Sequence, residues 1–204
     1  MLIAFAGLPS AGKSTTAKAL AEKLGARWFV EPEEDQWPLA VTERKRVGHF
    51  TALTWFRSVR VPLLYAAAAA AESDGVAVVD SYYDVLISRY IGQDPFAWLL
   101  GPDDPYFAVA QQMAELDWAG LPHADVLVFL RLEAQVWNTF MDRRSRTLDR
   151  TAHLKEQFAM QSLMEEACQQ AKREHGSHLI VIDQQDSSPA ATAERVAAML
   201  PKLS

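Results

Sequence analysis

A glycine-rich segment near the N-terminus constrains the fold of this chain more than any other feature. Residues 7–14 read GLPSAGKS and match the pattern G-x-x-x-x-G-K-[ST]. The apolar run Leu2–Ala6 precedes the segment, and the stretch Ala17–Leu24, with apolar residues at helical spacing, follows it. A loop in this position directs several backbone N–H groups at one phosphate, and the helix N-terminus adds its partial positive charge. The sequence therefore predicts a phosphate-binding loop.

The residues of this loop have separate expected roles. We expect Lys13 to reach the β- and γ-phosphates of ATP and the hydroxyl of Ser14 to bind Mg²⁺. ATP and Mg²⁺ are thus the expected cofactors. The nucleotide-binding residues predicted from the loop are Gly7, Ser10, Ala11, Gly12, Lys13, Ser14 and Thr15.

Short apolar runs alternate with segments of helical periodicity along the 204 residues. This alternation predicts an α/β fold of the P-loop NTPase kind, in which helices flank a five-stranded parallel sheet within one domain, residues 1–204. The predicted strands are Leu2–Ala6, Ala26–Val30, Val76–Val79, Val126–Leu130 and Leu179–Ile182. The helices predicted after Ala17–Leu24 are Thr42–Ser73 (broken at Pro62), Ser81–Ile91, Pro105–Ala119, Glu133–Arg144, Thr151–Arg173 and Pro189–Leu200.

Composition excludes several classes of protein. Acidic residues outnumber basic ones, 26 to 20, which argues against a surface that coats nucleic acid. Cys168 is the only cysteine, so neither an intramolecular disulfide nor a thiolate zinc cluster is possible. No stretch approaches the roughly 18 apolar residues of a membrane span, and Met1–Ala6 lacks the charged start of an export signal. We therefore expect a cytoplasmic protein without nucleic-acid or membrane partners.

The motifs that follow the other predicted strands indicate the class of P-loop protein. A GTPase would carry Asn-Lys-x-Asp after a strand, and this sequence has no such motif. Motor and AAA-type ATPases have longer chains and usually an acidic pair after the second motif strand. Here the strand Val76–Val79 is followed by Asp80 and then Ser81. A small kinase is the class that remains.

Several further motifs resemble those of known kinases. Glu31-Pro32 after the second predicted strand, with Trp37 downstream, resembles the deoxyribonucleoside kinases. The strand Ala124–Leu130 with the arginine-rich segment Arg143–Arg150, and Val181–Asp183 before the last helix, resemble thymidylate kinase equally well. The resemblance spans nearly the full chain. It implies MgATP-dependent phosphoryl transfer to the hydroxyl of a small molecule, a (deoxy)nucleoside being the first candidate.

The resemblance implies roles for two carboxylates. Glu31 matches the residue that deprotonates the acceptor hydroxyl in nucleoside kinases, and a carboxylate at a strand end can accept that proton. Asp80 matches the acid of the family's Glu-Arg-Ser or Asp-Arg-Tyr motif and would hold Mg²⁺ through water. Thymidylate kinases carry an arginine just before Glu-Pro, where this chain has Val30. This difference favours a hydroxyl acceptor.

The chain also departs from the family at the acceptor site. Ser81 stands where the motif has an arginine, so Arg57 and Arg60, three residues apart on one helix face, are the candidate substitutes. Nucleoside kinases read the base with a glutamine in this helix, and none occurs between Gly48 and Arg60. The polar alternatives are His49, Thr51, Thr54 and Ser58. Trp37 and Tyr82, with Phe50 and Trp55, are the aromatic residues expected to stack on a flat substrate.

Arginines gather in a short segment that is predicted to form a lid, about residues 143–150. Closing over the γ-phosphate, one or two of them would neutralise charge that develops during transfer. Arg143 and Arg146 are the predicted catalytic arginines, and Arg150 is predicted to contact the nucleotide. The alternative interpretation is a helix C-terminus that favours cations through its dipole. Arg144 completes the group.

Other functions stay open at this point. The chain would be a thymidylate-kinase-like nucleoside monophosphate kinase if the acceptor were a phosphate, or a small-molecule kinase acting on a different alcohol. It would be a catalytically degraded nucleotide-binding regulator if the changes at Ser81 and in the long helix had abolished transfer. Related kinases commonly dimerise through their long helices, so a homodimer is also expected.

Overall fold

The computed structural model of the chain describes residues 1–144, 154–185 and 188–201. Within these residues, one parallel sheet of five strands has the order β2-β3-β1-β4-β5. This confirms the predicted α/β fold, with strand ends shifted by a few residues. The strands are β1 (Leu2–Gly7), β2 (Arg27–Phe29), β3 (Ala77–Val79), β4 (Val126–Leu132) and β5 (His178–Gln184).

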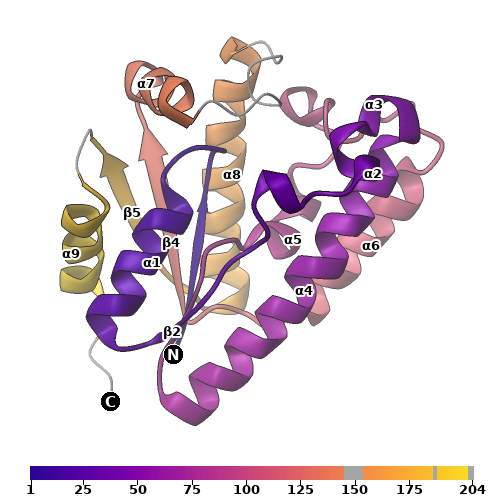
Figure 1. Cartoon of the computed structure of the whole chain (residues 1–204). Coiled ribbons are helices and arrows are strands. Elements are labelled where there is room, and N and C mark those ends of the chain that lie inside the picture. The colour runs from indigo at the N-terminus through magenta and orange to yellow at the C-terminus, as the bar shows by residue number, and fades with distance from the viewer. Residues whose placement is uncertain (145–153, 186–187, 202–204) are drawn as a thin grey trace.

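Helices cover the sheet on both sides (Figure 1). Helices α1 and α9 pack together against one face, and α4 and α8 pack against the other. The longer helices are α1 (Lys13–Leu24), α4 (His49–Asp74), α6 (Phe107–Gly120), α7 (Ala134–Arg144), α8 (Leu154–His175) and α9 (Pro189–Met199). The short ones are α2 (Leu39–Thr42), α3 (Arg44–Val47) and α5 (Tyr83–Leu86), with 3-10 turns η1 (Glu34–Gln36), η2 (Ile87–Arg89) and η3 (Asp94–Phe96).

The long helix α4 differs from the prediction at Pro62. The helix runs through Pro62 without a break, whereas the sequence predicted an interruption there. A proline inside a helix removes the bond to the carbonyl four residues earlier, which here belongs to Ser58. Both Ser58 and Pro62 are exposed, so water can satisfy that carbonyl. The helix therefore tolerates the proline on its outer face, and its apolar face stays continuous.

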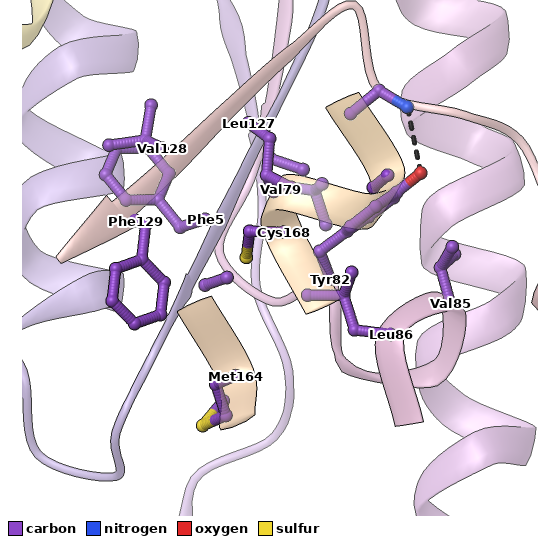
Figure 2. Packing of buried hydrophobic residues seen from close by; sticks show 14 of the residues in the cluster. Phe5, Val79, Tyr82, Val85, Leu86, Leu127, Val128, Phe129, Met164 and Cys168 are labelled. Atoms are coloured by element: carbon purple, nitrogen blue, oxygen red, sulfur yellow. Dashed lines mark hydrogen bonds between the residues drawn. The ribbon is translucent and has the colours of Figure 1, made fainter. Parts of the chain in front are cut away.

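The buried core lies between the sheet and α8 (Figure 2). Phe5 of β1, Phe129 of β4 and Cys168 of α8 are fully buried, and Met164 of α8 is nearly so. Burial raises the pKa of the Cys168 thiol, which keeps it protonated. Cys168 therefore fills space in the core and does not serve as a nucleophile. In the described part of the chain, no helix is long and apolar enough to span a bilayer.

Large apolar side chains are exposed on α4 and α6. They include Tyr65 of α4 and Val109 and Leu116 of α6. An ion pair between Arg57 and Asp117 joins these two helices. A second copy of the chain would cover this surface if the expected homodimer forms through the long helices, and that pairing stays a prediction.

The phosphate loop begins at Gly7, the last residue of β1, which pairs with Leu130 of β4. Gly7 has a φ of +138°, and a Cβ added to it would lie 2.7 Å from the carbonyl oxygen of Leu130. A side chain at this position is therefore excluded both by the backbone conformation and by contact with β4. Only glycine lets the chain leave the strand here without separating the two central strands.

We expect Gly7→Ala to lower the free energy of unfolding by about 2–5 kcal/mol, from backbone strain together with overpacking. Gly25→Ala is the matched control, because Gly25 also has a positive φ, +63°, but no atom lies within 4 Å of the added Cβ. That variant should lose only the strain, about 1–2 kcal/mol. Urea unfolding measures both values. Equal losses in the two variants would contradict the role assigned to the contact with Leu130.

Candidate active site

A cavity of about 430 Å³ extends from the phosphate loop to the side chains of α4 and α8. Glu31 and Arg60 also line it, together with a group of mainly apolar residues. The loop residues on the cavity are Gly7, Ser10, Gly12, Lys13, Ser14 and Thr15. The mainly apolar group includes Trp37, Ala52, Leu53, Phe56, Phe96, Trp98, Leu99, Met160 and Met164. Most of the predicted nucleotide-binding residues therefore share one cavity with Glu31.

The loop has the conformation that an anion site requires. Gly12 caps α1 in the left-handed region, φ 81°, and no side chain caps this helix end. The first-turn amides of α1 are thus directed at the loop interior, where a helix favours negative charge. Lys13 Nζ donates to the carbonyls of Gly7 (3.1 Å) and Leu8 (2.9 Å), which holds its ammonium within the loop. Ala11 is buried beneath, and its N–H donates to the carbonyl of Leu8 (3.2 Å).

The loop is also fixed from α7. The indole N–H of Trp137 donates to the carbonyl of Pro9 at 2.9 Å, and the Trp137 side chain is fully buried. Burial of a large ring with its one donor satisfied holds the loop and α7 together. Nothing in the sequence around Trp137 indicated this contact, because the two residues are 128 positions apart.

Glu31 and Asp80 meet because they follow neighbouring strands, β2 and β3. The N–H of Asp80 donates to the carbonyl of Phe29 (3.1 Å), and the N–H of Glu31 reaches Oδ1 of Asp80 at 3.4 Å. Burial, followed by the negative charge of Glu31, raises the pKa of Asp80 to about 6, despite the lowering effects of Ser14 and Lys13. Arg60 partly balances the charge of Glu31, so Asp80 is the carboxylate of this pair whose charge is less well compensated.

A divalent cation fits this local shortage of positive charge. Asp80 is buried, and its Oδ2 atom has no hydrogen-bond partner in the described part of the chain. Proteins commonly bind Mg²⁺ with one or two of their own oxygen ligands, such as a carboxylate and a serine hydroxyl. Water and the phosphates of a nucleotide supply the remaining ligands. Among the described residues, no group of three or more His, Cys, Asp or Glu side chains forms a metal cage. The donors present therefore fit a cation shared with a bound nucleotide.

Arg60 lies between Glu31 and Asp84. Its Nε and Nη2 donate to the two oxygens of Asp84 at 2.7 and 3.2 Å, and its Nη1 lies 3.4 Å from Oε2 of Glu31. The guanidinium also lies 4.8 Å from the centre of the Tyr83 ring. Burial opposes the charge of Arg60, but the carboxylates of Asp84 and Glu31 outweigh it and raise the pKa. The side chain is only 11% exposed, so this arrangement is nearly rigid.

Arg57 has a different environment from Arg60, although the two residues are one helical turn apart. Its Nε and Nη2 donate to Asp117 of α6 at 2.6 and 2.7 Å. Arg57 does not line the cavity, and the structure does not bring it to the other predicted site residues. Its predicted role in substrate binding is therefore replaced by a structural one, the joining of α4 to α6.

Of the aromatic residues predicted to surround the substrate, some line the cavity and others do not. Trp37 lines the cavity and packs edge-on against Phe56 at 5.0 Å. Phe50 instead stacks on Tyr106 at 4.8 Å, and Trp55 packs against the outside of Phe56. Neither Phe50 nor Trp55 reaches the cavity.

Tyr82 contacts the cavity with its ring while its polar end points into the core. Its hydroxyl accepts the N–H of Ala124 at 3.0 Å, drawn as the dashed line in Figure 2, and reaches the carbonyl of Pro122 at 3.4 Å. The side chain is buried, and burial raises the pKa of its hydroxyl. Tyr82 therefore ties the start of β4 to the end of β3 and offers a substrate at most part of an apolar wall.

The predicted lid falls mostly outside the described residues. Arg146 and Arg150 lie outside them, and Arg143 and Arg144 form the last turn of α7, of which only the backbone is described. The roles predicted for these arginines stay predictions.

Several residues at or beside the cavity escaped the sequence-based reasoning. Asp84, which contacts Arg60, is an acid between Tyr83 and Val85 in a buried segment, and such a setting signals a buried ion pair without naming its partner. The missed residues that line the cavity include Arg44 of α3, Phe56 of α4, Trp98, and Met160 and Met164 of α8, and they carry no shared motif.

Comparison with known proteins supports the fold. No family model and no curated protein sequence matches the chain. Solved structures of a deoxyadenosine kinase from M. mycoides are similar to it. One with dCMP and dCDP matches at a TM-score of 0.65 and 17% identity over 97% of each chain. One with dCTP matches at 0.62 and 16% over 98% of this chain and 100% of that chain. One with dATP matches at 0.70 and 16% over 97% of this chain and 100% of that chain. The chain therefore has the fold of these kinases.

The position of the Tyr82 hydroxyl leads to a testable expectation. Tyr82→Phe should lower the free energy of unfolding by about 1–3 kcal/mol, because it leaves the buried N–H of Ala124 without a partner. Tyr106→Phe, at an exposed ring, should change stability by less than about 0.5 kcal/mol. Urea unfolding provides the comparison, and calorimetry should give an ATP dissociation constant for Tyr82→Phe that is unchanged. Weaker nucleotide binding without loss of stability would restore Tyr82 as a ligand-binding residue.

Proposed function

We propose that the protein transfers the γ-phosphoryl group of ATP to a hydroxyl of a small molecule, a (deoxy)nucleoside being the first candidate. The observation that carries this proposal is the presence of Glu31 in the same cavity as the phosphate loop, 3.4 Å from the buried Arg60. A carboxylate opposite a triphosphate site can accept a proton from an attacking hydroxyl. The similarity in fold to a deoxyadenosine kinase is consistent with the proposal.

In the proposed reaction, Glu31 accepts the proton of the acceptor hydroxyl as its oxygen attacks the γ-phosphorus. Its carboxylate is 29% exposed and is approached by one N–H of Arg60, which leaves the remaining lone pairs for the hydroxyl. Lys13, held within the loop by two carbonyl groups, would neutralise charge on the transferring phosphoryl group. These residues supply positioning and charge, which are most of what phosphoryl transfer requires.

Arg60 would take the place of the arginine that the family carries where this chain has Ser81. Because Asp84 occupies two of its N–H groups, the guanidinium has a fixed plane with its third nitrogen toward Glu31. In that position it would orient the carboxylate and the acceptor oxygen together. Arg143 and Arg146 of the proposed lid would add positive charge at the γ-phosphate, with Arg150 on the nucleotide.

Asp80 and Ser14 would hold the magnesium ion of MgATP. When bound, the ion would shield negative charge on the phosphates.

A second cavity of about 440 Å³ at the ends of β4 and β5 is lined by residues that include Leu132, Gln184 and Gln185. The side-chain nitrogen of Gln184 lies 3.5 Å from a Cβ added to Gly12. This proximity to the phosphate loop supports it as the place for the donor base.

The charges around Arg60 favour a hydroxyl over a phosphate acceptor. Arg60 already interacts with Asp84 and Glu31, so the group of three carries a net negative charge. A dianionic acceptor placed there would be repelled, whereas a neutral hydroxyl would not. The nucleoside monophosphate kinase alternative therefore has less support from this part of the cavity.

Replacing the proposed base separates these alternatives. For a hydroxyl acceptor, Glu31→Gln should lower kcat by at least about a hundredfold, because general base catalysis is lost. The dissociation constant for ATP should stay unchanged. The exposed Asp35→Asn is the control for an altered carboxylate nearby, and its kcat should equal that of the wild type. A coupled ADP-release assay over nucleosides, nucleoside monophosphates and other alcohols makes the measurement. A fall below about tenfold would point to a phosphate acceptor.

A pair of matched variants tests Asp84 as a positioning residue. Asp84→Asn removes the carboxylate that orients Arg60, and kcat should fall by about ten- to a hundredfold with the KM for ATP unchanged. Asp117→Asn disrupts the equivalent pair with Arg57, which does not reach the cavity. That variant should lose stability in urea unfolding while its kcat is preserved. Parallel losses of kcat in both variants would show that Asp84 acts only through stability.

A further inference from the structure

Much of the cavity lining apart from Glu31, Arg60 and the phosphate loop consists of rings and hydrocarbon side chains. We refer to it as the apolar end, and define it by Trp37, Leu53, Phe56, Trp98, Met160 and Met164. An acceptor whose hydroxyl meets Glu31 would place the rest of its structure here. The chemistry of this region therefore decides which acceptors bind.

The two tryptophans of the apolar end present no polar group to the cavity. The indole N–H of Trp37 donates to the carbonyl of Pro32 at 3.0 Å. The indole N–H of Trp98 donates to the sulfur of Met160 at 3.2 Å. An indole has one donor and no acceptor, so each ring is satisfied by the protein itself. Both are left with an apolar surface for stacking.

Helix α4 contributes an apolar surface in the same way. Between His49 and Arg60, the residues of α4 that line the cavity are Ala52, Leu53 and Phe56. The hydroxyl of Thr54 donates to carbonyls of its own helix at 3.0 and 3.1 Å, and that of Ser58 does so at 2.7 Å. These hydroxyls, expected from the sequence to read a base, are therefore engaged within α4 and lie off the cavity.

Several of the neighbouring polar groups are engaged with the protein or buried in the wall. Arg60 donates to Asp84 and Glu31, as described above. The hydroxyl of Tyr83 and Nδ1 of His49 are buried within the wall, and neither atom has a partner in the described part of the chain. Glu33, Arg44 and Ser81 also line the cavity. No described lining residue is an asparagine or glutamine, the side chains that pair a donor and an acceptor with a base edge.

We propose that the acceptor is a hydroxyl compound with a flat aromatic group of low polarity, which the apolar end holds by stacking and shape. This inference rests on the proposed function and names its substrate class. A nucleoside base that entered the apolar end would leave donors and acceptors without partners, at a cost of about 1–3 kcal/mol for each buried group. A hydrocarbon ring of the same size carries no such cost.

Deoxyribosides that differ only in the base provide the test. The probes are deoxyadenosine, deoxycytidine and the deoxyribosides that carry phenyl or naphthyl in place of the base. Titration calorimetry in the presence of a non-hydrolysable ATP analogue measures each Kd, and ADP release measures turnover. We expect the aryl compounds to bind at least about tenfold more tightly than the natural nucleosides, as the loss of one unpaired polar group predicts.

Leu53 allows the preference to be changed. Leu53→Gln places a carboxamide on the cavity wall and should reduce the aryl preference by at least about tenfold, because the base edge gains a partner. Leu53→Met is the matched control, since it keeps an apolar side chain of similar size, and it should preserve the preference. Urea unfolding and ATP binding establish that both variants are folded.

The outcomes separate this inference from the proposed function. Tighter binding of a natural nucleoside than of the aryl compounds by wild-type protein would overturn the inference, whatever Leu53→Gln does. Absence of turnover with every hydroxyl compound would overturn the proposed function, while the order of Kd values would still decide the inference. Absence of binding by all four probes would overturn the inference.

Discussion

The site depends on how the charge of two carboxylates is balanced at one edge of the sheet. Glu31 and Asp80 follow neighbouring parallel strands, so the fold itself brings them together. The protein treats them differently. Glu31 receives the buried guanidinium of Arg60, whereas Asp80 keeps an oxygen without a partner and a pKa raised to about 6, mainly by burial. Glu31 is thus oriented by a guanidinium, whereas Asp80 keeps an oxygen that a cation would contact in the proposed site.

Arg57 and Arg60 show what sequence reasoning can and cannot separate. Their spacing placed both on one helix face as candidates for substrate binding, and in the structure each forms a two-bonded pair with an aspartate. Which of them reaches the cavity depends on the partner, since Asp117 lies on α6 and Asp84 lies just beyond β3. Helical periodicity tells in which direction a side chain leaves the helix axis. It does not tell which helix, strand or loop packs against the helix in that direction. The spacing alone therefore could not tell which of the two arginines lines the cavity.

Local patterns predicted the fold well and the cavity walls poorly. The strands and their alternation with helices follow from short-range periodicity, and the structure confirms them. The departure at Pro62 arose because tolerance of a proline depends on whether Ser58 faces water, which is a tertiary property. Trp98, Phe56 and Met160 likewise come together from separate elements, and nothing in their local sequence marks them as neighbours.

The apolar end and the charged residues of the cavity are physically coupled. An acceptor that filled the apolar end would displace water from the cavity, and the attraction between Arg60 and Glu31 would then strengthen because the local dielectric falls. An apolar acceptor group that fills this space would also remove the water that could otherwise attack the γ-phosphate. Recognition by shape would then serve specificity and protect ATP from hydrolysis at the same time. A polar base would keep some of its bound water molecules when it entered the cavity. Water would then have more access to the γ-phosphate than with an apolar acceptor.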